Sequence, residues 1–386
     1  MILSEVLKNT AVPTSFLEEW RYTAVKKILN EDYSFDEPVL EIKEDPTWFD
    51  PLFYNFIFIN GFFQKDLSHS GQLNSYFSAT ESKNTDFNEN DYFMRLSQNL
   101  GRSQINLSVK HSPKRPIRFL FITTPTAAKQ CSLPRLKIDV AEHVEVNFIE
   151  EFRNSGREGL NVDLFDVKVS PSAKVRWFTL NFNKDDGEKN RRLHYLRFNV
   201  GQNAHLEHYC LCFGNQFIRS QLHVVLQEEA KVYLKSANLL TGSCHVDLQT
   251  EIIHAEPKTH SEQQYKSITA GKSKFIFRGK IHIAHAAKNS IAHQKNQNIK
   301  LSSESEIDTQ PILNIDCNEV QCSHGATISA LRNEDIFYMQ ARGISADQAK
   351  ILLGRSFLIE TLSGLEDLFL KNLILDMIKN HDELFN

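Results

Sequence analysis

A spacing of about 29 residues recurs along the middle of the chain and restricts its possible folds more than any other feature. In each copy an aliphatic residue is followed by a small or apolar residue and, two positions later, by a second aliphatic residue. The copies begin at Val140, Val169, Val200, Leu226, His254, Ile283 and Asp316, the last three being less regular. Strand-like segments lie between the copies, without intervening helices. This period is typical of a β-solenoid, in which each turn covers the apolar face of its neighbour.

The sequence therefore predicts a mainly β fold, with a right-handed parallel β-helix (β-solenoid) as its core over residues 105–330. Residues 1–104 are expected to form an N-terminal helical region with a β-hairpin, and residues 331–386 a C-terminal helical domain. The hairpin is predicted around Asn60-Gly61, which lies between two apolar segments. A β-sandwich of irregular hairpins stays open for the middle of the chain, because the last three copies are imperfect.

Helices are expected at both ends. Most of the first 30 residues are predicted to be helical, because Phe16, Trp20, Val25 and Ile28 approximate one apolar stripe. Polar residues between 79 and 105 predict a loop that leads into a short helix.

At the other end, Gly343 is a good stop for a helix that begins near residue 334. Ser345 and Gln348 predict a capping box for a second helix, which would extend to about Leu362. The apolar stripe of a last helix, residues 365–379, is wider than a surface helix needs. Part of it must contact either the solenoid or another protein.

Composition excludes several classes of function. The net charge of −4 gives no basic footprint, which argues against nucleic acid as the main partner. No apolar run approaches the roughly 18–20 residues that span a bilayer, and the first 20 residues are too acidic for a signal peptide. Six cysteines without a C-x-x-C pair suit a reducing compartment, so a cytoplasmic protein is expected.

Cys322 and His324 are the candidate metal ligands. Residues two apart on a strand share a face, so the thiol and the imidazole would point the same way. One soft and one borderline ligand can begin a zinc or iron–sulfur site, but closed sites use about four ligands. The alternative is a buried cysteine and a hydrogen-bonded histidine. Because Val320 is in phase with both, they would start on the inward face and reach a partner only where the solenoid ends or twists.

Other groupings favour structural roles. Cys210 and Cys212, with His208, alternate on a face that the repeat places inward, so they are expected to fill the core. The three histidines between residues 282 and 293 match no compact metal motif and are expected to be solvated or hydrogen-bonded.

No nucleophile elbow, kinase set or dinucleotide-binding motif is present. The sequence predicts no catalytic residue, and hence no enzyme.

Residues 310–343 contain P-I-L-N-I-D-C-N-E-V-Q-C-S-H-G-A-T and then I-F-Y-M-Q-A-R-G. This stretch resembles the C-terminal signature of the SufB/SufD family. The resemblance continues upstream through Y-K-S-I at 265–268, F-R-G-K-I at 277–281 and H-Q-K-N-Q-N at 293–298, and it reappears as E-E-W-R-Y-T at 18–23. It is dense over residues 260–360 and sparse between 30 and 260. The W-R-Y-T segment, the shorter chain and the lack of clustered N-terminal cysteines favour the SufD branch.

The resemblance implies a non-enzymatic scaffold subunit of the SUF iron–sulfur cluster assembly complex, with a SufB paralogue and the SufC ATPase as partners. In this family the C-S-H-G-A-T motif lies at the pairing interface, where its histidine is a proposed cluster ligand. Carried over, that residue is His324, with Cys322 beside it. The isolated chain would hold no stable cofactor, and an iron–sulfur cluster would be transient and shared across subunits.

Two other functions stay open from the residues themselves. One is a secreted-type β-solenoid enzyme acting on polysaccharides, although a signal peptide and an acidic or basic groove ladder are missing. The other is a metal-free homodimeric interaction module.

Overall fold

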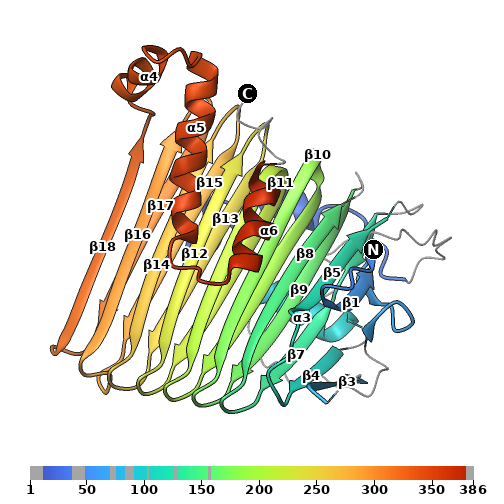
Figure 1. Cartoon of the computed structure of the whole chain (residues 1–386). Coiled ribbons are helices and arrows are strands. Elements are labelled where there is room, and N and C mark those ends of the chain that lie inside the picture. The colour runs from blue at the N-terminus through green and yellow to red at the C-terminus, as the bar shows by residue number, and fades with distance from the viewer. Residues whose placement is uncertain are drawn as a thin grey trace.

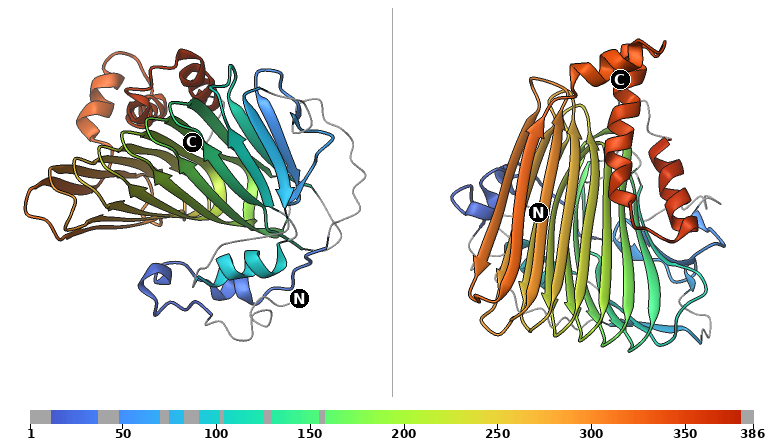
Figure 2. Two further views of the ribbon diagram at one scale, coloured as in Figure 1. Left: turned by 90° about the horizontal axis from the view of Figure 1, so that it is seen from below. Right: turned by 60° about the vertical axis from the view of Figure 1, so that its left-hand side comes forward.

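The computed structural model describes residues 12–36, 48–69, 75–82, 91–101, 104–124, 129–154 and 158–379. Within these residues the chain is mainly β, with short helices at its two ends (Figure 1). The strands wind into a flattened parallel solenoid whose turns each contribute one strand to each of two facing sheets (Figure 2). The parallel β-solenoid predicted from the repeat is therefore confirmed.

The first sheet contains nine strands or half-strands and has β18 as its C-terminal edge strand. Its strands, in spatial order, are β1 (Tyr54–Ile59), β5 (Ile117–Thr123), β8 (Glu145–Asn154), the first half of β10 (Lys174–Val200), the first half of β11 (His205–Leu226), β12 (Lys231–Leu240), β14 (His260–Thr269), β16 (Ser290–Lys300) and β18 (Val320–Ser329).

The second sheet faces it. Its strands are β4 (Gln104–Val109), β7 (Arg135–Val140), β9 (Gly159–Val169), the second halves of β10 and β11, β13 (His245–His254), β15 (Lys274–Ile283) and β17 (Glu306–Ile315). The short strand β6 (Gln130–Ser132) also pairs with β9.

The predicted repeat corresponds to one solenoid turn. Its starting residues lie side by side in one ladder at the end of the second sheet, from Val140 through Val169 and onward to Ile283. The last copy is displaced by one position, because Ile283 pairs with Ile315 and not with Asp316. The corner that follows the starting residue spans residues 141–144 after β7, but 255–259 after β13 and 284–289 after β15, so the later copies are less regular in sequence.

Aromatic rings fill the interior of the early turns. Phe119 stacks on Phe148 with ring centroids 5.9 Å apart, and Trp177 lies 5.0 Å from Phe148. These rings come from successive strands of the first sheet, so they stack along the solenoid axis. Ten of the 27 phenylalanines of the chain are buried in this core.

The helix predicted for most of the first 30 residues is wrong over residues 12–30. Only a 3₁₀ turn, η1 (Glu18–Trp20), and one helical turn, α2 (Lys26–Leu29), form there, and residues 1–11 lie outside the described residues. The segment runs along the outer face of the second sheet, where Thr23 Oγ1 donates to Asp247 at 2.6 Å. Contacts with the sheet replace the hydrogen bonds of a continuous helix.

The remaining N-terminal predictions hold in part. Asn60 and Gly61 both have positive φ and join β1 to β2 (Phe62–Phe63) in the expected hairpin. The helix expected before residue 105 is α3 (Tyr92–Leu100), capped by the Asp91 side chain. The start of the expected loop is instead a strand, β3 (Phe77–Ser82), which pairs antiparallel with β4.

The C-terminal helices form as predicted. They are α4 (Asn333–Gln340), α5 (Ala346–Ile359) with the 3₁₀ turn η4 (Glu360–Leu362), and α6 (Leu368–Lys379). Ser345 caps α5 by accepting from Gln348 N, as the sequence indicated. Helices α5 and α6 lie on the outer face of the first sheet, whereas α4 lies beyond it (Figure 1). None of the described helices is long and apolar enough to cross a bilayer.

Candidate functional site at the open end of the solenoid

The strand that carries Cys322 and His324 lies at the edge of the first sheet. β18 pairs with β16 through ten residues, from Ser290↔Val320 to Ile299↔Ser329, and forms the left-hand margin of the molecule in Figure 1. Eight of its ten residues are exposed, and none is fully buried. This strand therefore ends the solenoid without the covering that earlier strands receive from the next turn.

Cys322 and His324 both belong to inward-facing columns of the first sheet. Cys322 pairs with Ala292, in the column that begins at the buried Val146, and His324 pairs with Gln294. The inward orientation inferred from the phase of Val320 is thus what the register shows. Because β18 is the last strand, the inward face is open there: His324 is exposed and Cys322 is half-buried.

The open end therefore places a thiol and an imidazole on one face of one strand. Partial burial raises the pKa of the Cys322 thiol, and a hydrogen bond involving the backbone of Ala292 acts in the opposite direction. In the described part of the chain, no group of three or more histidine, cysteine, aspartate or glutamate side chains is arranged to hold a metal ion. Two ligand types with suitable chemistry are therefore present, which is fewer than the roughly four ligands of a closed site.

The interior next to this strand is polar, which sequence reasoning missed. Ser267 Oγ donates to Asn298 Oδ1 at 2.5 Å, and Asn298 Nδ2 donates to Asn296 Oδ1 at 2.6 Å. Asn296 in turn donates to the Tyr265 carbonyl. The available signal was the alternation of amides at 294, 296 and 298, which puts all three on one face of β16.

A second polar cluster lies deep in the early turns. Arg192 forms ion pairs with Glu150 and Asp163, and all three side chains are almost completely buried. Burial penalises the charged form and raises the pKa of Asp163 to about 6 despite Arg192. Buried charges are tolerated only when paired, so this cluster is consistent with a structural role.

Histidines line the same cluster in their neutral form. Burial lowers the pKa of His194 to about 3 and that of His208 to about 4. His208 Nε2 lies 3.0 Å from Thr179 Oγ1. Cys210 and Cys212 are also buried, which confirms that this strand face fills the core.

The three histidines between residues 282 and 293 are hydrogen-bonded, as expected. His282 Nε2 lies 2.9 Å from Asp316 Oδ2, and His285 Nδ1 lies 3.2 Å from the Asp316 carbonyl. His293 Nδ1 lies 2.7 Å from Ser323 Oγ, on the outer face of β18. These contacts fasten the last turns together.

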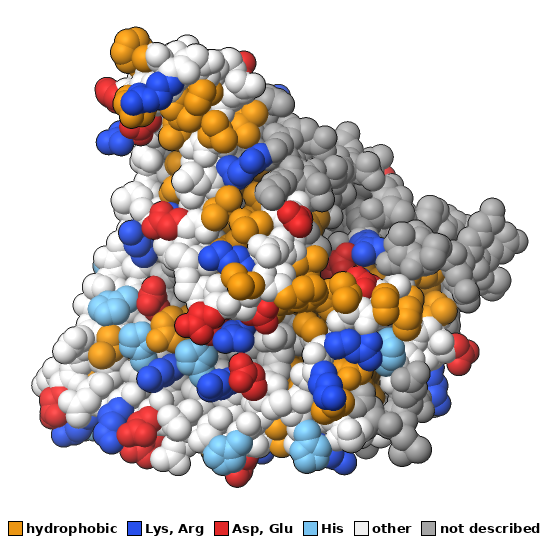
Figure 3. All heavy atoms as spheres, in the orientation of Figure 1, with side chains coloured by type: hydrophobic (Ala, Val, Ile, Leu, Met, Phe, Trp, Pro, Cys, Tyr) orange, Lys and Arg blue, Asp and Glu red, His pale blue; other side chains and the backbone are white. Residues whose placement is uncertain are grey.

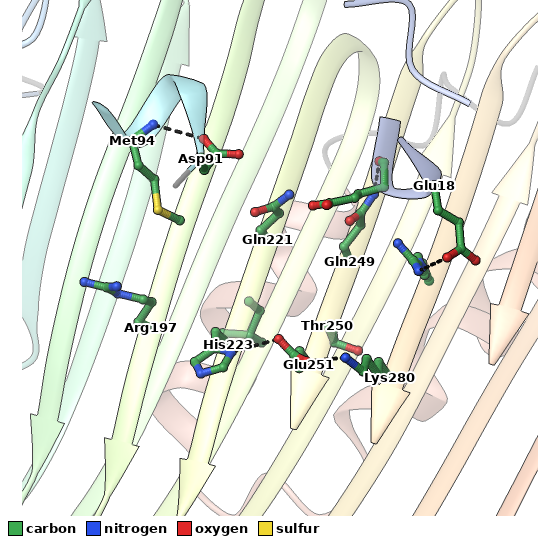
Figure 4. A pocket seen from close by; sticks show the side chains of 13 residues that line it. Glu18, Asp91, Met94, Arg197, Gln221, His223, Gln249, Thr250, Glu251 and Lys280 are labelled. Carbon is green, nitrogen blue, oxygen red and sulfur yellow. Dashed lines mark hydrogen bonds and ion pairs between the residues drawn. The ribbon is translucent and has the colours of Figure 1, made fainter. Parts of the chain in front are cut away.

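A cavity of about 510 Å³ lies between the N-terminal segment and the outer face of the second sheet (Figure 4). His223 and Lys280 both contact the Glu251 carboxylate, at 3.2 and 2.8 Å. These contacts outweigh desolvation and lower the pKa of Glu251 to about 2. Glu18 pairs with Arg278 at 3.0 Å on the other side of the cavity. The charged groups here neutralise one another, so this cavity is a weaker candidate than the open end.

Comparison with known proteins identifies relatives of this chain. The chain is 25% identical to the iron-sulfur cluster assembly protein SufD of Escherichia coli, over 96% of this chain and 90% of that protein. It is 25% identical to the SufBD family protein slr0076 of Synechocystis, over 93% and 85% of the two chains. It is 26% identical to the chloroplastic protein ABCI7 of Arabidopsis thaliana, over 98% and 83%.

The family description "SUF system FeS cluster assembly, SufBD core domain" matches residues 121–357, a span that includes the solenoid turns from β8 onward, strand β18 and most of α5. This span contains both candidate ligands. The match favours cluster assembly over the alternative function of a polysaccharide-active solenoid enzyme. The chain therefore belongs to the SufBD family of the SUF iron–sulfur cluster assembly system.

Proposed function

We propose that this chain is a non-enzymatic, cytoplasmic scaffold subunit that pairs with a SufB paralogue and with the SufC ATPase. In this proposal an iron–sulfur cluster is assembled transiently at the interface with the SufB paralogue. The observation that carries the proposal is the open end of the solenoid, where Cys322 and His324 occupy an exposed edge strand.

The edge strand is suited to binding a partner. A sheet edge presents unpaired backbone groups that readily accept another strand, and natural proteins usually cover or charge such edges. Here β18 also exposes Ile328 to 49%, and the neighbouring β17 exposes Ile315 to 43%. A partner strand added to β18 would cover these apolar side chains and enclose the thiol and the imidazole at once.

The ligand count supports a shared site. Cys322 and His324 supply one soft and one borderline ligand, and an iron–sulfur cluster needs about four. A second solenoid that meets this edge could contribute the remainder. The cluster is then cargo that is built and released, and the isolated chain binds none stably.

Helices α5 and α6 are the proposed docking site for the ATPase. Leu370, Ile374 and Ile378 of α6 are buried against the solenoid. Leu368 of the same helix is 71% exposed, and Leu352 of α5 is 43% exposed. Hydrophobic side chains are visible over this helical region in Figure 3. The wide apolar stripe is thus divided between the solenoid and a surface available to a partner.

Co-expression with candidate SufB and SufC proteins tests the proposal. We expect a stable complex that contains all three chains and, after reconstitution, binds iron and acid-labile sulfide that this chain alone does not bind. Size-exclusion chromatography of the isolated chain should show a monomer or a homodimer through the same edge. Failure to form any complex, or equal cluster binding by the isolated chain, would contradict the proposal.

A further inference from the structure

Gln294 lies beside the candidate site, on β16, directly in register with His324. Its side chain is buried, with 3% of the residue exposed. Neither the nitrogen Nε2 nor the oxygen Oε1 of its carboxamide has a hydrogen-bond partner among the described residues. Unpaired buried polar groups are costly and rare, so an amide with both atoms unused indicates a hydrogen bond that the present arrangement of side chains does not make.

The opposite sheet makes room for this carboxamide. Gly279 of β15 lies against it, and a β-carbon at that position would overlap Gln294 Nε2. A glycine inside a strand weakens the strand unless something must approach closely. The space at Gly279 is therefore consistent with a carboxamide that is held in a defined place.

The neighbouring glutamine in the column is bonded differently. Gln263 of β14 pairs in register with Gln294, on the side away from His324. Its Oε1 accepts a hydrogen bond from Thr250 Oγ1 at 2.7 Å. Gln263 is thus anchored inside the protein, whereas Gln294 lies one strand closer to the open end with its oxygen still available.

The chemistry of histidine ligands assigns a role to this oxygen. A ligating imidazole binds metal through one nitrogen and almost always donates the N–H of the other to an acceptor, which fixes its tautomer and orientation. In-register residues on neighbouring strands are about 4.8 Å apart, within reach of a glutamine side chain. We propose that Gln294 Oε1 accepts a hydrogen bond from the ring N–H of His324. Gln294 is then a positioning residue, and this role rests on the proposed function of His324.

Gln294→Leu tests the role in the complex with the SufB paralogue and SufC. Leucine has a similar size and removes an amide that lacks a protein partner, so the thermal stability of the chain should be unchanged or higher. Iron and sulfide bound per complex should fall about 10-fold, the lower end of the loss seen when such partners are removed. Gly279→Ala displaces the same carboxamide from the opposite sheet and should reduce loading as well. Gln263→Leu is the matched control and should load normally.

A second readout needs no cluster. In the isolated chain, ¹⁵N shifts of labelled histidines report which nitrogen of neutral His324 carries the proton, with His324→Ala assigning the signals. We expect one dominant tautomer, which Gln294→Leu converts to a solution-like mixture. The same tautomer in both proteins, together with normal loading of Gln294→Leu, overturns the inference. If His324→Ala itself loads normally, the ligand role in the proposed function fails, whereas the tautomer result still decides the role of Gln294.

Discussion

The guanidinium of Arg219 lies over the ring of Trp20, 3.9 Å from its centroid, although the two residues are far apart in the sequence. Trp20 is 1% exposed, and Arg219 also donates to Asp247 Oδ2 at 2.5 Å. Thr23 donates to the same carboxylate. This cluster fastens the N-terminal segment across the outer face of the second sheet, from which it contacts several solenoid turns.

Trp20→Ala should therefore destabilise the protein strongly. Removing a buried tryptophan leaves a cavity and costs about 3–5 kcal/mol, and here the cation also loses its ring. Urea unfolding followed by tryptophan fluorescence or circular dichroism measures the change. The matched control is Phe16→Ala in the same segment, where the ring is 96% exposed. Equal stabilities of the two variants would mean that the N-terminal segment contributes little to the fold.

Much of the fold could be predicted because a solenoid repeats its constraints. Most turns bury an aliphatic residue at the same corner, so the pattern beginning at Val140 recurs and indicates the architecture. The C-terminal helices could also be predicted, because Ser345 and Gly343 act on their own local backbone. These signals are local or periodic, and neither depends on a distant contact.

The N-terminal segment shows why prediction failed elsewhere. The spacing of Trp20 and Val25 suits a helix, but Trp20 is buried by Phe93 and Arg219, which come from elsewhere in the chain. Such contacts override local periodicity, and they cannot be predicted from the first 30 residues alone. The proposed role of Gln294 could not be predicted from the sequence for the same reason. That its amide makes no hydrogen bond is apparent only when its neighbours in space are known.

The sequence predicted which face of the strand carries the candidate ligands, but not whether that face is exposed. Val320 indicated that Cys322 and His324 share the inward face, and the register agrees. Whether that face is covered depends on where the solenoid stops, which is a property of the whole chain. In the structure His324 is exposed, so it does not act as a buried core residue in this chain.

Stability should fall as the pH is lowered from 7 to 5. The folded-state pKa values of His208 and His254 are lowered to about 4, chiefly by burial, and that of His194 to about 3. Between these values and the ordinary value near 6.5, the unfolded chain binds protons that the folded chain does not. Asp163, whose pKa is raised to about 6, acts in the opposite direction, as does Asp91, whose pKa burial also raises, but these two carboxyls oppose three strongly shifted imidazoles. The expected net loss is roughly 3–5 kcal/mol.

Urea unfolding at pH 7, 6 and 5 measures this dependence. His208→Leu removes one of the titrating groups and should make the decline shallower, even if it lowers stability at pH 7. A free energy of unfolding that stays constant or rises toward pH 5 would show that these imidazoles are not neutral and buried as described.

The double variant Leu352→Ser/Leu368→Ser should weaken capture of the SufC ATPase at least several-fold. Both side chains are exposed, so the free energy of unfolding should change by no more than about 0.5 kcal/mol. Pull-down with tagged ATPase measures binding. Leu370 lies on α6, as Leu368 does, but is only 1% exposed. Leu370→Ser should therefore lower the free energy of unfolding by about 2–5 kcal/mol.

A matched control addresses which helix binds. Phe337 of α4 is as exposed as Leu368, at 71%, but lies before the helices proposed to dock the ATPase. Phe337→Ser should leave capture of the ATPase unchanged. If it abolishes capture while the double variant binds normally, the docking site belongs to α4 and the assignment to α5 and α6 is wrong.

His324→Ala and Cys322→Ser should separate cluster loading from folding. Because His324 is exposed on an edge strand, its removal should leave the isolated chain as stable as the wild type within about 0.5 kcal/mol. In the complex with the SufB paralogue and SufC, each variant should assemble normally but retain less iron and sulfide, since a shared site loses one of its few ligands. The matched control is Ser323→Ala, on the opposite face of the same strand, which removes the contact with His293 but no proposed ligand. Normal iron and sulfide content in the His324→Ala complex would leave this motif with a role in subunit pairing alone.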